Sequence, residues 1–157
     1  MNDPFALPPR LWFGVLCYAL GSDPAGQITL QGVFNQVAFL SPPEQSGVPP
    51  NAFLNAVLAV GFSEGLGHFD ADVDLRDIDD TVLWQRPGGQ WSFDLGPGDR
   101  NAAVLAEQVR YWFTQPGRFY FRIYLPSVQA EHQIPFEVAE RVGPAELASD
   151  ASPELPR

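Results

Sequence analysis

The sequence predicts an all-β fold, namely an antiparallel β-sandwich, immunoglobulin-like in the broad sense, of about eight or nine strands. Several short segments alternate apolar and polar residues, as strands with one buried face do. Clusters of Gly, Pro, Asp and Ser separate these segments at fairly regular spacing. A length of 157 residues with 45% hydrophobic content fits one domain that can bury its own core.

Most of the chain is expected to form a single domain. We assign the sandwich to residues 11–140, after a proline-rich arm at 1–10 and before a flexible tail at 141–157 that has no sustained apolar period. Residues 41–51 contain four prolines, and this loop is long enough to cross from one sheet to the other.

Two segments are apolar on both faces, as strands in the middle of a sheet are. They are residues 12–20 and residues 53–62, and we expect both to be central strands. Residues 27–39 resume as a strand after a turn at 22–26, and Gly32 marks a bulge within it.

The next strands are expected to be half-exposed. In residues 68–76 one face holds Phe69, Ala71, Val73 and Leu75, and the other holds His68, Asp70, Asp72, Asp74 and Arg76. After a tight turn at Asp77–Asp80, residues 81–85 return as a hairpin partner. Residues 91–95 form another short strand between two glycine-rich turns.

The C-terminal part supplies the remaining strands. Residues 109–113 read as strand, whereas residues 102–108 leave helix and strand open by composition, with strand favoured. A turn at 114–117 leads to the strongly alternating residues 119–125. Residues 128–139 form the last strand, in which Pro135 implies an edge position or a bulge.

Charge narrows the classes of partner. The chain has no lysine, and its nine arginines against 19 carboxylates give a net charge of −10. Such a field repels phosphate backbones and anionic lipid, so we expect neither nucleic acid nor a membrane surface as a direct ligand.

The lone cysteine and the apolar segment around it point to a strand in a reducing compartment. Cys17 has no partner for an internal disulfide, which favours the cytoplasm, and its apolar setting predicts a buried side chain rather than a nucleophile. Residues 11–20 have the length of a signal-peptide core, but Asp3 and a single arginine make a poor leader, so we read them as strand.

From the sequence we expect no catalytic residue, no metal ligand set and no cofactor. The P-loop and H-E-x-x-H are absent. His68 and His132 are the only histidines, and no short ligand spacing links them. The Asp70, Asp72 and Asp74 series lies along one face of a strand, a flat arrangement that rarely converges on one ion and is typical of a solvated face.

The candidate binding site is a group of aromatic and arginine residues near the 114–117 turn. If that turn joins two antiparallel neighbours, five side chains share one outer sheet face: Arg110, Trp112, Tyr120, Arg122 and Tyr124. Trp, Tyr and Arg are enriched in interface hot spots, so this face predicts a partner-binding surface. The alternative is that cross-strand aromatic and arginine pairs only stabilise the sheet.

The order of several segments resembles a bacterial family of small uncharacterised β-sandwich proteins. The segments are Val15-Leu16-Cys17-Tyr18, then Gly26-Gln27-Ile28-Thr29-Leu30-Gln31-Gly32-Val33-Phe34, Asp77-Ile78-Asp79-Asp80 and Pro116-Gly117-Arg118-Phe119-Tyr120-Phe121-Arg122-Ile123. The resemblance covers residues 11–139, implies a sandwich and favours a protein without enzymatic activity. The proline-rich loop at 41–51 and the segment 86–100 depart from the family pattern.

These observations predict a non-enzymatic, cytoplasmic interaction or structural module that binds a protein or associates with itself. One alternative is a carbohydrate-binding module whose exposed Trp and Tyr rings stack on sugars. A second alternative is a metal-dependent enzyme that uses His68, His132 and the Asp70 strand.

Overall fold

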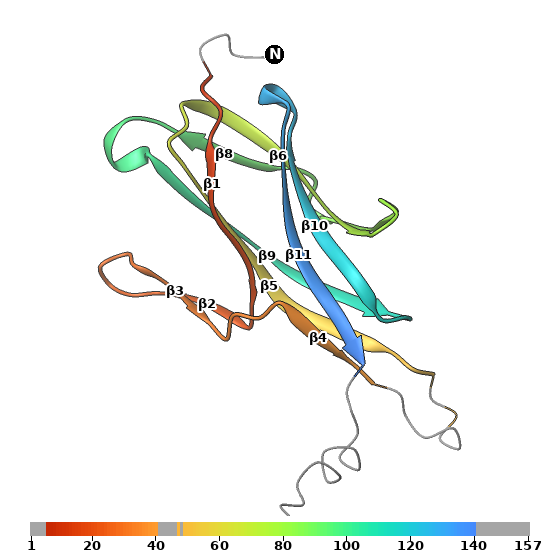
Figure 1. The fold of residues 1–157 in the computed structure, drawn as a ribbon. Helices are drawn as coiled ribbons and strands as arrows, with labels where there is room; N and C mark the ends of the chain where they lie inside the picture. The colour runs from red at the N-terminus through yellow and green to blue at the C-terminus, as the bar shows by residue number, and fades with distance from the viewer. Residues whose placement is uncertain (1–5, 41–46, 48, 141–157) are drawn as a thin grey trace, which may run out of the picture.

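In the computed structural model, residues 6–40, 47 and 49–140 are described, and they form a β-sandwich (Figure 1). The strands in this part of the chain are β1 (Arg10–Cys17), β2 (Ala19–Ser22), β3 (Ile28–Gln31), β4 (Gln36–Phe39), β5 (Ala52–Ser63), β6 (Gly67–Asp77), β7 (Val82–Gln85), β8 (Trp91–Leu95), β9 (Ala102–Phe113), β10 (Gly117–Leu125) and β11 (Ala130–Glu140). Two 3-10 turns, Gly98–Arg100 and Pro126–Val128, precede β9 and β11.

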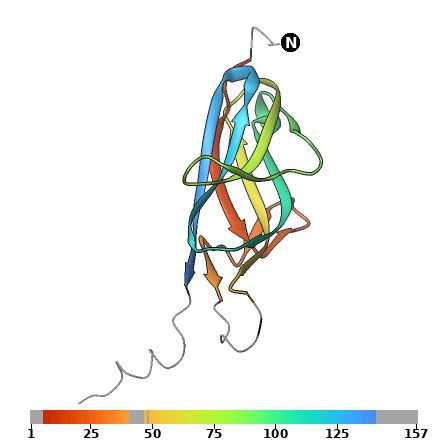
Figure 2. The same cartoon turned by 90° about the vertical axis from the view of Figure 1, so that its right-hand side faces the viewer.

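Two sheets face each other across the core. One has three strands in the order β1-β5-β9, and the other has the order β4-β11-β10-β6-β7, with β8 paired to the remaining length of β6. All neighbours are antiparallel except β4, which runs parallel to β11. The hairpin of β2 and β3 lies at one end of the tall, narrow sandwich (Figure 2). The all-β sandwich prediction is therefore confirmed.

The structure has more strands than predicted because two expected strands are each broken in two. Residues 12–20 divide at Tyr18 into β1 and β2, and residues 27–39 divide into β3 and β4. Gly32 starts the second break: its φ of 63° is open to glycine, and an added Cβ would lie 2.4 Å from the ring of Tyr18.

The prediction that residues 12–20 form a central strand is wrong, because β1 is the outer strand of the three-stranded sheet. Its second apolar face is covered locally. The ring of Phe13 lies on the backbone of Gly61, where an added Cβ would meet it at 2.4 Å, and Leu16 is bridged to Phe34. Cys17 is fully buried, as expected.

Other strand predictions are confirmed. β5 is the central strand, pairing with β1 on one side and with β9 over twelve residues on the other. β6 buries Phe69, Ala71, Val73 and Leu75, and β7 returns beside it as a hairpin partner. Residues 102–108 belong to β9 and are strand, not helix.

Pro135 occupies the free-edge position expected of a proline. β4 pairs with β11 only from Glu137 onward, so the stretch of β11 at Pro135 has β10 as its single neighbour. A missing N–H costs no ladder hydrogen bond at such a place.

The 41–51 loop and the two ends of the chain are only partly within the described residues. β4 and β5 lie in different sheets, so the 41–51 loop links the sheets as predicted, although most of it is outside the described residues. The tail at 141–157 and residues 1–5 of the arm also lie outside them. The end of the arm is attached, because Leu7 exchanges backbone hydrogen bonds of 2.9 and 3.2 Å with Leu66.

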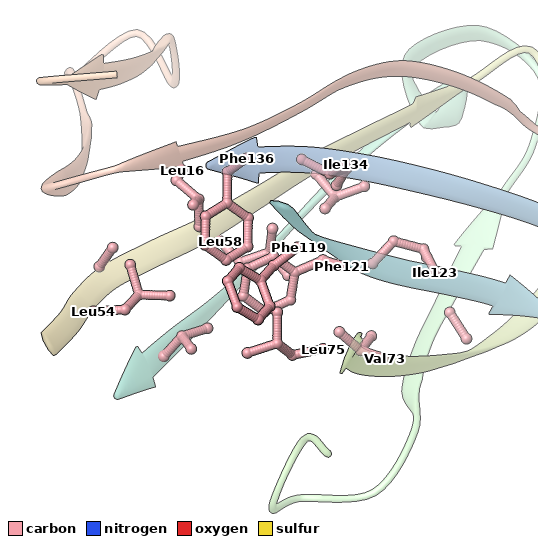
Figure 3. Close-up of a cluster of buried hydrophobic side chains, with 14 of the residues drawn as sticks. Leu16, Leu54, Leu58, Val73, Leu75, Phe119, Phe121, Ile123, Ile134 and Phe136 are labelled. Carbon is pink, nitrogen blue, oxygen red and sulfur yellow. The ribbon is translucent and has the colours of Figure 1, made fainter. Parts of the chain in front are cut away.

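The core lies between β5 and the strands β6, β10 and β11, as Figure 3 shows. Four phenylalanines form its aromatic centre, with ring centroids 4.6 to 6.0 Å apart: Phe113, Phe119, Phe121 and Phe136. Such aromatic pairs contribute about 0.5–1.5 kcal/mol each beyond the area they bury. They come from three strands of both sheets and hold the layers together.

The two sheets are in close contact where β1 passes β11. A Cβ added at Gly14 would lie 2.4 Å from Cδ1 and 2.6 Å from Cγ1 of Ile134, so Gly14 is required for this contact. By contrast, a Cβ added at Gly21 in β2 meets nothing within 4 Å.

We therefore expect Gly14→Ala to lower the free energy of unfolding by about 1–3 kcal/mol, the usual cost of overpacking. Urea unfolding measures it, with Gly21→Ala as the control that should stay within about 0.5 kcal/mol of wild type. In an Ile134→Ala background the cost of Gly14→Ala should largely disappear. An undiminished cost in that background would show that the strain lies elsewhere.

Candidate functional site

The five predicted site residues do not share one face. Arg110 and Trp112 belong to β9 in the three-stranded sheet, whereas Tyr120, Arg122 and Tyr124 belong to β10 in the other sheet. The expected pairing of these two strands is wrong. The turn at 114–116 carries the chain from one sheet to the other, because Phe113 and Phe119 on either side of it both enter the core.

The inward and outward directions along both strands are nevertheless as predicted. Val109, Phe113, Phe119, Phe121 and Ile123 are buried, and Tyr111 packs partly against the core. The other residues consequently point away from the core, on two opposite outer faces of the sandwich.

The first of these faces carries what we call the aromatic surface: Phe53, Asn55, Arg110 and Trp112. Trp112 pairs directly with Phe53 across β9 and β5, and the two rings stack with centroids 4.3 Å apart at 25°. Both remain accessible, Trp112 at 59% and Phe53 at 41% of their surface. The stack fixes the indole in place while leaving it open to solvent.

Polar groups flank this stack on one side. Arg110 pairs in register with Asn55, and Gln108 donates a 2.9 Å hydrogen bond to Oδ1 of Asn55. Arg110 is the only charged side chain of β5 and β9 on this face, since Glu107 points inward. In the part of the chain that the structure describes, this patch of an acidic protein therefore lacks negative charge.

Sequence reasoning missed Phe53 and Asn55, because residues 53–62 were expected to be buried on both faces. The burial holds from Leu58 to Phe62, but the first residues of β5 alternate. The signal was present in the polar Asn55 two positions after Phe53.

The second outer face is organised around a buried carboxylate. Asp74 is only 3% exposed, and it accepts hydrogen bonds from Arg76 (Nε to Oδ1, 2.8 Å) and from Arg122 (Nη2 to Oδ2, 2.6 Å). Burial acts to raise the pKa of Asp74, but the hydrogen bonds from Arg76 and Arg122 outweigh it, so the pKa lies below the ordinary 3.8.

The remaining predicted residues belong to the same network. The guanidinium of Arg122 lies 5.5 Å from the ring centroid of Tyr124, and the hydroxyl of Tyr120 donates to Asp80 in the 77–80 turn, which raises the pKa of Tyr120. All three side chains are half-buried. On this face the sheet-stabilising alternative describes them well.

The acids that precede Asp74 along β6 also have local partners. Asp70 accepts from Ser92 at 2.5 Å, and Asp72 accepts from Gln90 at 2.9 Å. His68 hydrogen-bonds Asp94 at 2.8 Å, which raises the pKa of His68. The predicted solvated face therefore fits Asp70, whose side chain is 45% exposed, but the prediction is wrong for Asp74, which is buried between two arginines.

The two histidines cannot act on one ion because they lie on opposite faces of the six-stranded sheet. His132 points inward against Phe62, with ring centroids 5.7 Å apart, its Nε2 has no hydrogen-bond partner, and burial lowers its pKa. Across residues 6–40 and 49–140, no three His, Cys, Asp or Glu side chains are grouped to hold a metal.

The single cysteine is buried and is not poised to react. Cys17 donates weakly to the carbonyl of Val57 at 3.7 Å, and burial raises the pKa of its thiol, so the thiol stays protonated.

A largely buried ion pair joins the two sheets beside β9. Arg86, which follows β7, donates from Nε to Oε2 of Glu107 at 2.5 Å.

The sequence matches no protein-family model, and no curated protein is significantly similar to it. The resemblance to a bacterial sandwich family therefore stays a prediction. In the described part of the chain no helix is long and apolar enough to cross a membrane.

The hydrogen bonds around Asp74 predict that this carboxylate contributes to the free energy of unfolding. Asp74→Asn leaves two guanidiniums without their carboxylate, and we expect a loss of about 3 kcal/mol at pH 7, the lower end for breaking a buried ion pair. Urea unfolding measures it, with the exposed Asp79→Asn as a control expected near wild type.

The same substitution should have a pH signature. Because the folded-state pKa of Asp74 is depressed, its contribution is complete above about pH 3.8 and is lost as pH falls below that value through the folded pKa. The gap between wild type and Asp74→Asn should therefore narrow in acid, and a gap independent of pH down to pH 2 would contradict the assignment.

Proposed function

We propose that this protein is a non-enzymatic interaction module that binds a protein partner through the aromatic surface. The observation that carries the proposal is the exposed indole of Trp112, held by its stack on Phe53 beside Arg110. Trp and Arg dominate interface hot spots, and a ring that is already ordered loses little entropy on binding.

Charge supports the same surface over the opposite one. Among the described residues, Arg110 faces solvent without an acidic neighbour on its own face, whereas Arg76 and Arg122 are occupied by Asp74. A partner with an apolar contact bordered by a carboxylate fits this patch. We place the module in the cytoplasm on the argument of the single, buried, protonated thiol.

A non-enzymatic role is supported by how the titratable groups of the other face are used. Asp70, Asp74 and His68 each have a structural partner within the sheet, so their chemistry is engaged in holding neighbouring strands.

Carbohydrate binding is the second candidate, favoured by one specific feature. The open face of Trp112 lies beside the hydrogen-bonding groups of Asn55, Gln108 and Arg110, and sugars are bound by such a combination of ring and polar groups.

A tryptophan comparison tests the proposal. Trp112→Asp should abolish capture of a protein partner from native lysate, and the purified partner should bind it more than tenfold more weakly by calorimetry, as for a hot-spot residue. Trp12→Asp is the matched control, because Trp12 is 67% exposed on β1 but lies outside the aromatic surface.

All three proteins must first show equal melting temperatures. Equal partner binding by Trp112→Asp and wild type would overturn the proposal. Loss of a glycan-array signal in Trp112→Asp, with no protein partner recovered by wild type, would replace it with the carbohydrate module.

A further inference from the structure

We propose that the protein forms a two-fold symmetric dimer in which the free edge of β9 pairs antiparallel with β9 of a second copy, centred on Val109. The proposal goes beyond the aromatic surface, because it uses the backbone edge of the strand rather than the face. Either proposal can fail without the other.

β9 is a long strand with an unprotected edge. It pairs with β5 in unbroken register over twelve residues, and in the described part of the chain it has no strand on its other side. It contains no proline, no lysine and no bulge. An edge of this kind presents a row of unpaired N–H and C=O groups that can accept another strand.

The other sheet edges of the described residues are protected in familiar ways. β2, β3, β4 and β7 have four residues each and β8 has five. β1 has a register shift between Leu11 and Phe13, and β11 carries Pro135 where its edge is free. Short strands, bulges and prolines are the devices that prevent edge pairing, and β9 has none of them.

Charge favours a second copy of β9 as the occupant. Although the whole chain has a net charge of −10, β9 contains one acid and one base, Glu107 and Arg110, and is locally neutral. Because antiparallel pairing by a two-fold axis places each residue opposite its symmetry counterpart, the positions of these two charges limit the allowed registers.

Registers centred on the charged residues are unfavourable. Centring on Glu107 places two carboxylates opposite each other, and centring on Arg110 does the same with two guanidiniums; like charges directly opposite destabilise a sheet. Centring on Gln108 is neutral but leaves Glu107 opposite Val109.

Centring on Val109 gives complementary pairs on both faces. On the outer face Gln108 lies opposite Arg110 of the second copy, and the small Ala106 lies opposite the large Trp112. On the inner face Leu105 lies opposite Phe113, and Glu107 lies opposite Tyr111.

The pair of Glu107 with Tyr111 of the second copy can form a hydrogen bond. Arg86 donates to Oε2 of Glu107 at 2.5 Å, which leaves Oε1 able to accept a hydrogen bond from the hydroxyl of Tyr111 in the second copy. The dimer would then have one continuous six-stranded sheet, with its two Trp112 side chains on the same side and offset by about 20 Å along the strands.

Gln108 provides the test, since it should meet Arg110 twice in each dimer. Gln108→Arg creates two Arg–Arg pairs and should raise the dimer Kd about fivefold, whereas Gln108→Glu creates two Glu–Arg pairs and should lower it by a similar factor. Both variants lose the Gln108 hydrogen bonds to Asn55 and Ala56, so each controls for that loss in the other.

Sedimentation velocity over a concentration series measures the Kd of wild type and of both variants, after equal melting temperatures are established. For wild type, added salt should tighten the dimer because it screens the repulsion between two acidic copies. A wild type that stays monomeric at its highest soluble concentration overturns the proposal. So does a shift of both variants in the same direction, which would place the contact elsewhere.

Trp112→Asp binding to a partner, the readout of the proposed function, is scored separately. The Gln108 variants are scored on dimerisation alone, because Gln108 adjoins Asn55 and Arg110 of the aromatic surface, so each proposal has its own variants and its own readout.

Discussion

The contact between Phe113 and Phe119 sets the rest of the architecture. Their ring centroids are 4.6 Å apart although Phe113 ends β9 and Phe119 is the third residue of β10, with only five residues between them. Because both rings enter the core from opposite sheets, the chain must cross between the sheets at this turn instead of forming a hairpin. That crossing assigns β9 to one layer and β10 to the other, and it separates the arginines and aromatics of the two strands onto opposite outer faces.

The two outer faces of the sandwich consequently have different roles. On the six-stranded sheet the charge is internal: Asp74 lies between Arg76 and Arg122, and their mutual hydrogen bonds offset the cost of burying a carboxylate. On the three-stranded sheet the exposed Trp112 has only a stacking partner beneath it. Residues of the same type therefore stabilise the sheet on one side and remain available on the other.

The sequence predicted the fold class, the central β5, the alternation along β6 and the inward residues of β9 and β10, since all of these follow from local periodicity. It could not predict which strands are neighbours, because the Pro116-Gly117 turn chemistry suits both a hairpin and a crossing between sheets. Nor could it show whether an apolar strand is central in a sheet or is an edge strand covered by local packing. In β1 the second explanation holds, because the ring of Phe13 lies over Gly61. The burial of Asp74 was hidden for the same reason: its two arginine partners are identified only by the register of β6 and β10.

The distribution of edge protection gives β9 its particular character. This chain uses a proline at the free edge of β11, a register shift in β1 and very short strands at the rim of the six-stranded sheet. Each device costs some ladder hydrogen bonding and is retained where unwanted pairing would be harmful. β9, the longest exposed edge in the described residues, has none of them, and its one inward acid is neutralised within the chain by Arg86. Because the other strand edges of the described residues are closed, the open edge of β9 supports the pairing with a second strand that we propose.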